Sequence, residues 1–83
     1  MQKIIITDDT TADVTEWYCE HNDLETDMED ALYVLFELTP SDDNWFDRLT
    51  TTGQCFFDYH GIYYNVTMCY GPNNTVNLIV SEA

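Results

Sequence analysis

The amino-acid sequence predicts a small α+β domain, with helices in its first half and an antiparallel sheet in its last third. Three observations predict this class. Helix-start motifs recur before residue 45, and the period of the apolar residues changes from 3.6 to 2 after residue 50. The composition, 45% apolar and 14% aromatic, is sufficient for a core in 83 residues. We expect a single domain over residues 1–83, in the order β-α-α-α-β-β-β, with a C-terminal antiparallel meander packed against the helices.

Residues 2–7 form a short β-branched run, which predicts a strand whose position in the sheet the sequence leaves open. A helix over about residues 11–21 is expected next, because Thr10 precedes Asp13 by three residues, the spacing of a capping box. The apolar stripe of this helix would consist of Val14, Trp17, Tyr18 and His21.

The same motif recurs at Thr26 and Thr39 and predicts helices over about residues 27–38 and 40–50. Pro40 fits the first turn of the last helix, where its missing N–H costs nothing. The core residues expected from these periods are Trp17, Leu32, Phe36, Trp45 and Phe57.

The last third of the chain alternates apolar and polar residues and predicts a three-stranded meander. A two-residue turn at His60-Gly61 would set Phe57 opposite Tyr64, since glycine tolerates a positive φ. The residues expected to face the core are Cys55, Phe57, Tyr59, Ile62, Tyr64, Val66, Met68, Leu78 and Val80.

A three-residue loop over residues 71–73 would close the second hairpin and set Met68 opposite Val76. Phe56 and Tyr63 would then lie on the outer face of the meander. There they would either be covered, by the first strand or by a second copy of the chain, or form an apolar contact patch.

Charge is the most informative property of the chain. Sixteen Asp and Glu residues stand against two Lys and Arg residues, for a net charge of −14. All the acids except Asp58 and Glu82 lie between Asp8 and Asp47. Self-repulsion of this size lowers the stability of a compact domain, so we expect the charge to bind a strongly positive partner surface. The alternative is an acidic surface that only keeps the domain soluble.

On the predicted first helix, Asp13, Glu16, Glu20 and Asp23 would form a continuous acidic stripe, because neighbours three or four residues apart lie about 5–6 Å from each other at Cβ. Duplex DNA carries one phosphate charge per about 1.7 Å of its axis, so such a stripe could imitate it. The expected partner-binding residues are Asp13, Glu16, Glu20, Asp23, Glu25, Asp27, Glu29, Asp30, Asp42, Asp43 and Asp47.

No motif for catalysis, metal binding or cofactor binding is present, so we expect none of these functions. Loops that start at Asp9 or Asp23 lack the glycine of a calcium-binding EF-hand. The cysteines and histidines lack zinc-site spacing, and Cys55 is expected in the core. The negative charge disfavours direct binding to DNA or RNA, and no apolar run is long enough to cross a membrane.

In its size, its acid-rich segment and its scarcity of Lys and Arg, the chain resembles small acidic phage proteins that mimic DNA. These include anti-CRISPR proteins, anti-restriction proteins and inhibitors of DNA glycosylases, which share no common fold. The resemblance implies a non-enzymatic inhibitor that blocks the Lys/Arg-lined groove of a nucleic-acid-binding protein. An anti-CRISPR protein acting on a Cas effector is the first specific expectation.

Other interpretations stay open. An immunity protein or antitoxin would neutralise a basic nuclease or toxin with the same charge. Halophilic adaptation would spread acids over the whole chain, whereas residues 50–83 carry few. A metal-dependent enzyme would need a motif that is missing. Three irregularly spaced cysteines make no disulfide framework, so we expect the protein in the reducing cytoplasm (of the host, if a phage encodes it). We expect a monomer or a homodimer.

Overall fold

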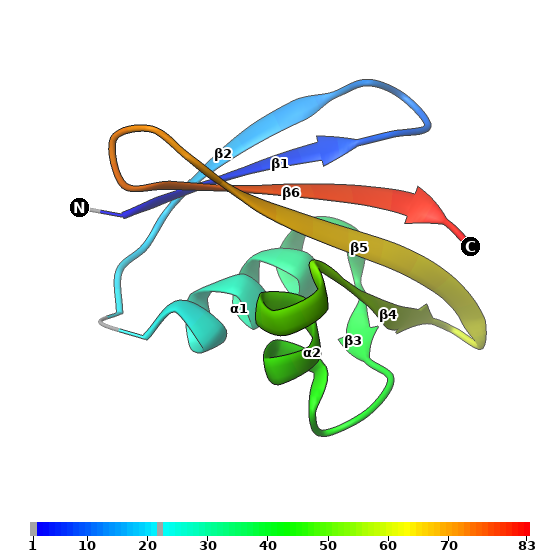
Figure 1. Cartoon of the computed structure of the whole chain (residues 1–83). Helices are drawn as coiled ribbons and strands as arrows, with labels where there is room; N and C mark the ends of the chain where they lie inside the picture. Colours follow the sequence, from blue (N-terminus) through cyan, green and yellow to red (C-terminus); the bar gives the residue numbers. More distant parts are fainter. Residues whose placement is uncertain (1, 22) are drawn as a thin grey trace.

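The computed structural model describes residues 2–21 and 23–83, which form a curled six-stranded sheet and two helices (Figure 1). The elements are, in chain order, β1 (Lys3–Asp8), β2 (Val14–Tyr18), α1 (Leu24–Phe36), β3 (Thr39–Pro40), α2 (Trp45–Thr52), β4 (Gln54–Tyr59), β5 (Ile62–Gly71) and β6 (Thr75–Glu82). The α+β class is therefore confirmed. The predicted order of elements is wrong, because a strand replaces the first predicted helix and a short strand precedes α2.

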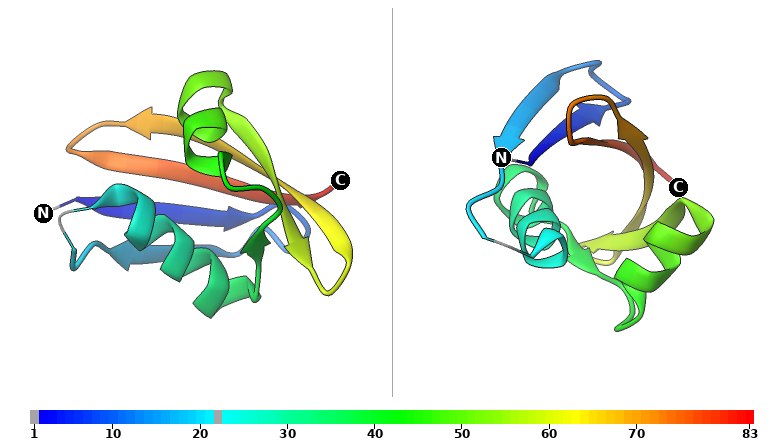
Figure 2. Two further views of the ribbon diagram at one scale, coloured as in Figure 1. Left: turned by 90° about the horizontal axis from the view of Figure 1, so that it is seen from below. Right: turned by 60° about the vertical axis from the view of Figure 1, so that its left-hand side comes forward.

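The six strands lie in the order β2-β1-β6-β5-β4-β3. Strands β1 and β6 are parallel, and all other neighbours are antiparallel. In the right-hand view of Figure 2 the sheet curls into most of a ring, and α1 lies between the two edge strands. Both helices lie on the same, concave side of the sheet, beneath β1, β6 and β5 in Figure 1.

The hydrophobic core fills the space between the concave face of the sheet and the two helices. Of the predicted core residues, Leu32, Trp45 and Phe57 are at most 4% exposed. The rings of Trp45 and Phe57 meet edge to face, with 5.3 Å between their centroids. Trp17 and Phe36 are only partly buried, at the margin of this core.

The predicted helix over residues 11–21 is wrong, because this segment forms a hairpin with β1. The chain turns at Ala12, whose φ is 64°, and Trp17 then pairs with Ile4. Burial along β2 alternates with a period of two. The apolar positions fitted a helical stripe as well, but β-branched and aromatic residues favour a strand when an isoleucine-rich partner is available. The outward side chains of β2 are Val14, Glu16 and Tyr18.

Helix α1 corresponds to the second predicted helix but begins three residues earlier, at Leu24. Its N-cap is Asp23, whose carboxylate accepts the backbone N–H of Glu25 at 3.2 Å and the hydroxyl of Thr26 at 2.7 Å. Thr26, the predicted cap, therefore lies inside the helix. The helix ends at Glu37, which adopts a left-handed conformation with a φ of 58°.

Helix α2 begins at Trp45, five residues later than predicted. Thr39 and Pro40, the predicted cap and first residue of this helix, instead pair with β4 as the edge strand β3. Proline is tolerated there because an edge strand leaves one row of N–H groups unpaired. The helix ends at Gly53, whose φ of 84° suits a residue without a side chain.

The register of the first predicted hairpin is confirmed, with Phe57 opposite Tyr64. His60 and Gly61 form its turn with φ values of 49° and 89°, as a two-residue turn requires. Ile62 was expected to face the core but is exposed, because it lies beside the turn. Phe56 and Tyr63 lie on the convex face as predicted, with ring centroids 6.3 Å apart.

The register of the second hairpin differs from the prediction by two residues. Met68 pairs with Leu78 instead of Val76, because the loop comprises residues 72–74 instead of 71–73. A shift of two leaves each side chain on its predicted face, whereas a shift of one would have inverted the strand. The predicted core positions of β6 are therefore correct although the pairing was not.

Candidate functional site

Carboxylates gather on the helical side of the molecule and at the ends of the strands. Among the described strands, the convex face of the sheet carries only Glu16 on β2 and Asp58 on β4. Asp58 also accepts the N–H of Gly61, which fixes the hairpin turn. The charge asymmetry seen along the sequence is therefore also an asymmetry in space.

An acidic hollow lies between α1 and the segment that leads into α2. It has a volume of about 370 Å³, and its acidic side chains are Glu29 from α1 and Asp42 and Asp43 from the connection. Trp45 forms part of its wall. The fold thus brings together carboxylates that are 13 and 14 residues apart in the chain.

A second acidic hollow lies on the other flank of α1, against β2. Its volume is about 330 Å³, and it is lined by Glu16, Glu20 and Asp30, together with Trp17 and His21. The six exposed carboxylates of the two hollows surround α1, and we call them the acidic band: Glu16, Glu20, Glu29, Asp30, Asp42 and Asp43.

Two apolar side chains lie on the exposed face of α1, between acidic neighbours. Tyr33 and Val34 are both well exposed. They follow Glu29 and Asp30 by one helical turn, and Glu37 follows Tyr33 by another. Apolar groups surrounded by charge are the usual composition of an interface centre and its rim.

Both strong bases of the chain are already paired with acids of the band. Lys3 Nζ lies 2.8 Å from Glu16 Oε1, and this hydrogen bond raises the pKa of the lysine. Arg48 lies 3.2 Å from Asp42. In the described residues the other four carboxylates of the band have no Lys or Arg partner.

Asp27 was predicted to bind a partner, but the structure buries its side chain, which is 2% exposed. Its carboxylate accepts the backbone N–H of His21 at 3.3 Å and lies 2.9 Å from His21 Nδ1. The hydrogen bond to Asp27 raises the pKa of His21. Burial, and secondarily Asp27, raises the pKa of the Cys19 thiol. Through its hydrogen bonds to His21, Asp27 holds the β2–α1 connection against α1.

The remaining predicted binding residues do not join the band. Asp13 lies in the β1–β2 connection and Asp23 caps α1. Glu25 and Asp47 lie in the first turns of α1 and α2, where negative charge favours the helix dipole. The predicted continuous stripe from Asp13 to Asp23 does not exist, because its helix does not exist.

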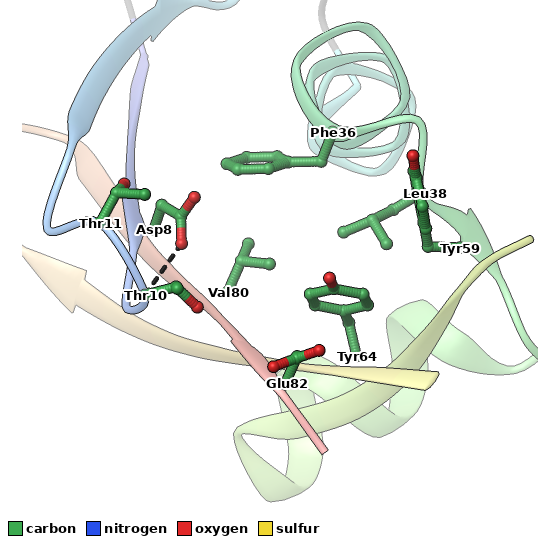
Figure 3. A pocket seen from close by; sticks show the side chains of 9 residues that line it. All are labelled: Asp8, Thr10, Thr11, Phe36, Leu38, Tyr59, Tyr64, Val80 and Glu82. Carbon is green, nitrogen blue, oxygen red and sulfur yellow. Dashed lines mark hydrogen bonds between the residues drawn. The ribbon is translucent and has the colours of Figure 1, made fainter. Parts of the chain in front are cut away.

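Sequence reasoning missed a pocket of about 270 Å³ on the concave side, at the ends of β1 and β6 (Figure 3). Aromatic rings from α1, β4 and β5 and carboxylates from β1 and β6 line it. Only the parallel pairing of β1 with β6 brings the two carboxylates together, and the sequence gives no local signal for it. The lining residues are Asp8, Thr10, Thr11, Phe36, Leu38, Tyr59, Tyr64, Val80 and Glu82.

Within residues 2–21 and 23–83, no three His, Cys, Asp or Glu side chains are grouped so that they could hold a metal ion. No helix in the same part of the chain has the length and apolar character needed to cross a membrane. Burial raises the pKa of the Cys55 thiol to about 11, so the thiol is protonated at neutral pH.

The chain was also compared with known proteins. It matches no protein-family model, and no curated protein and no solved structure is significantly similar to it.

Proposed function

We propose that this protein is a non-enzymatic inhibitor that binds a Lys/Arg-lined surface of a nucleic-acid-binding protein and competes there with the nucleic acid. The observation that carries the proposal is the acidic band. Its six carboxylates come from β2, the β2–α1 connection, α1 and the β3–α2 connection, and the chain's own Lys and Arg neutralise only two.

The physical advantage of the band is its long-range field. A net charge of −14 on 83 residues attracts a basic surface before contact and speeds association. Once docked, Tyr33 and Val34 would be desolvated at the centre of the contact and would slow dissociation. Charge and apolar contact thus act on different steps of binding.

The proposal rests on the overall field and not on a phosphate-by-phosphate match. Glu25 lies in the first turn of α1 and Glu37 directly follows its last residue, so twelve residues, or about 18 Å at 1.5 Å per residue, separate them. Four exposed acids over that length are sparser than the phosphates of a duplex, which carry one charge per about 1.7 Å. The flanking acids from β2 and from the β3–α2 connection are needed to raise the density of negative charge on this surface.

The resemblance to acidic phage inhibitors makes an anti-CRISPR protein that occupies a Cas effector the first specific form of the proposal. The same band would serve an immunity protein or antitoxin that neutralises a basic nuclease or toxin. Identifying the basic protein that this chain binds would distinguish the anti-CRISPR protein from the immunity protein or antitoxin.

The test compares two variants of equal charge. Glu29→Lys/Asp43→Lys reverses the band, and Glu25→Lys/Asp47→Lys reverses exposed acids outside it; each replacement changes the charge by two, so both variants go from −14 to −10. Each protein is immobilised, basic proteins are captured from a lysate, and labelled DNA or RNA is competed against the inhibitor on the captured protein.

We expect the parent to displace the nucleic acid and the band variant to do so about tenfold less well, while the control stays close to the parent. Added salt should weaken the parent complex, since the Debye length falls from about 10 Å at 0.1 M to about 3 Å at 1 M. A gel shift should detect no direct binding to DNA or RNA. Equal losses in both variants, no effect of salt, or direct nucleic-acid binding would refute the proposal.

A further inference from the structure

The pocket in Figure 3 has an aromatic wall. Phe36 enters it from the end of α1, and Tyr59 and Tyr64 enter from the two strands of the β4–β5 hairpin. The two tyrosine rings stand edge to face, with centroids 6.1 Å apart, which fixes their orientation. Buried Leu38 and Val80 form the base.

Two carboxylates face this wall. Asp8 pairs in register with Val80, and Glu82 pairs with Tyr64, so both acids lie at one end of the sheet. The N–H of Thr10 donates to Asp8 Oδ1 at 2.9 Å, which orients that carboxylate. Neither Asp8 Oδ2 nor the carboxylate of Glu82 accepts a hydrogen bond or forms an ion pair within residues 2–21 and 23–83. Both remain available to a ligand.

The lining favours one class of ligand. An anion would be repelled by both carboxylates, and a neutral apolar group would leave them without a partner. A cation gains from both features, because aromatic faces attract it and carboxylates bind it through charge-assisted hydrogen bonds. The chain's own Lys3 and Arg48 are engaged with Glu16 and Asp42 and do not line the pocket.

The shape of the cation and the volume of the pocket favour a guanidinium group on a single side chain. A planar guanidinium can stack on a ring and bind a carboxylate through two N–H groups at once, which a compact ammonium cannot do. A volume of about 270 Å³ lies just below the range of about 300–1,000 Å³ typical of pockets for whole small molecules. It suits a single side chain that enters from outside.

We propose that this pocket binds a guanidinium group, and that its natural occupant is an arginine side chain of the basic partner. The identification of the occupant as an arginine of the partner rests on the proposed function. The guanidinium would stack on the face of one of the two tyrosine rings and donate to Asp8 and Glu82. The pocket would thus give the complex a specific anchor beyond the diffuse attraction of the acidic band.

The first experiment needs no partner. N-acetyl-arginine amide is titrated into the whole protein, and the ring signals of Phe36, Tyr59 and Tyr64 are followed by NMR. N-acetyl-citrulline amide, which has nearly the same shape without the charge, is the control ligand. We expect saturable shifts of these signals with the arginine compound only.

Variants then locate the site. Asp8→Asn/Glu82→Gln should weaken arginine binding at least about tenfold. Glu25→Gln/Asp47→Asn removes the same charge at exposed positions outside the pocket and should bind like the parent. The fold of each variant is checked by its amide spectrum. Equal shifts with citrulline, shifts outside the pocket, or equal losses in both variants would overturn the proposal.

The partner complex separates this inference from the proposed function. If arginine binds in the pocket but the protein displaces no nucleic acid from any captured basic protein, the pocket proposal stands and the inhibitor proposal fails. If a basic protein is inhibited equally by the parent and by Asp8→Asn/Glu82→Gln, the inhibitor proposal stands and the anchor role fails.

Discussion

Truncation of Leu32 to alanine tests whether α1 packs on the concave face of the sheet, where it supports the acidic band. The side chain of Leu32 is 0% exposed, so its loss removes buried methyl groups and leaves a cavity. Such replacements cost about 2–5 kcal/mol. At about 0.05–0.15 kcal/mol per residue, a chain of 83 residues has a total stability of only about 4–12 kcal/mol. Leu32→Ala should therefore remove a large fraction of it.

The matched control is Val34→Ala, two positions away on the same helix. Val34 is 64% exposed, so we expect a change within about 0.5 kcal/mol. Urea unfolding followed by tryptophan fluorescence measures both variants, and a thermal melt should show a fall of at least about 8 °C for Leu32→Ala, at about 4–8 °C per kcal/mol. Similar midpoints for the two variants would show that the assigned faces of α1 are wrong.

Three further predictions concern titration, thiol reactivity and backbone strain. The NMR titration of His21 should give a pKa above the ordinary 6.5, and Asp27→Asn should lower this pKa. Because the pKa of His21 is raised in the folded state, its pair with Asp27 stabilises the fold fully below about pH 6.5. This stabilisation is lost as the pH rises through the pKa of the folded state. Iodoacetamide should modify exposed Cys69 in the native protein, whereas Cys55, which is buried and has a pKa of about 11, should react only after unfolding; peptide mapping that finds equal labelling would contradict this. Gly53→Ala should cost about 1–2 kcal/mol in urea unfolding, because the φ of 84° is strained for a residue with a Cβ; an unchanged midpoint would argue against this helix end.

The elements that the sequence predicted correctly are those in which the hydrophobic period and the local turn chemistry agree. The hairpin around His60 and Gly61 is an example, because alternation and turn length select the same register. Helix α1 is another, because Met28, Ala31 and Leu32 fit only one face of a helix. Long periodic segments of this kind contain most of their own structural information.

The errors fall where a short motif was the main argument. Thr10 and Asp13 have the spacing of a capping box, but the helix they predicted competes with a strand that pairs with β1. Thr39 has the same spacing from Asp42, yet it lies in an edge strand. Such pairing depends on residues distant in sequence, which a local motif does not include.

The candidate sites were only partly predictable for the same reason. The excess of acids indicated a charged surface, but the grouping of Glu29 with Asp43 depends on how α1 meets the approach to α2. Burial of Asp27 depends on the path of the β2–α1 connection. The aromatic pocket depends on a parallel pairing that joins the two ends of the chain.

That parallel pairing also determines the order in which the molecule can assemble. Strand β6 lies between β1 and β5, so residues 75–82 connect the N-terminal hairpin to the rest of the sheet. A nascent chain whose residues 75–82 are still in the ribosome lacks the pairings that join β1 to β5 through β6. The pairing of β1 with β6 requires contacts across more than 70 residues, which slows folding relative to a chain with local pairings. Until β6 is in place, the edges of β1 and β5 are open to strands of other chains, and we expect repulsion between chains that each carry a net charge of −14 to oppose aggregation at these edges.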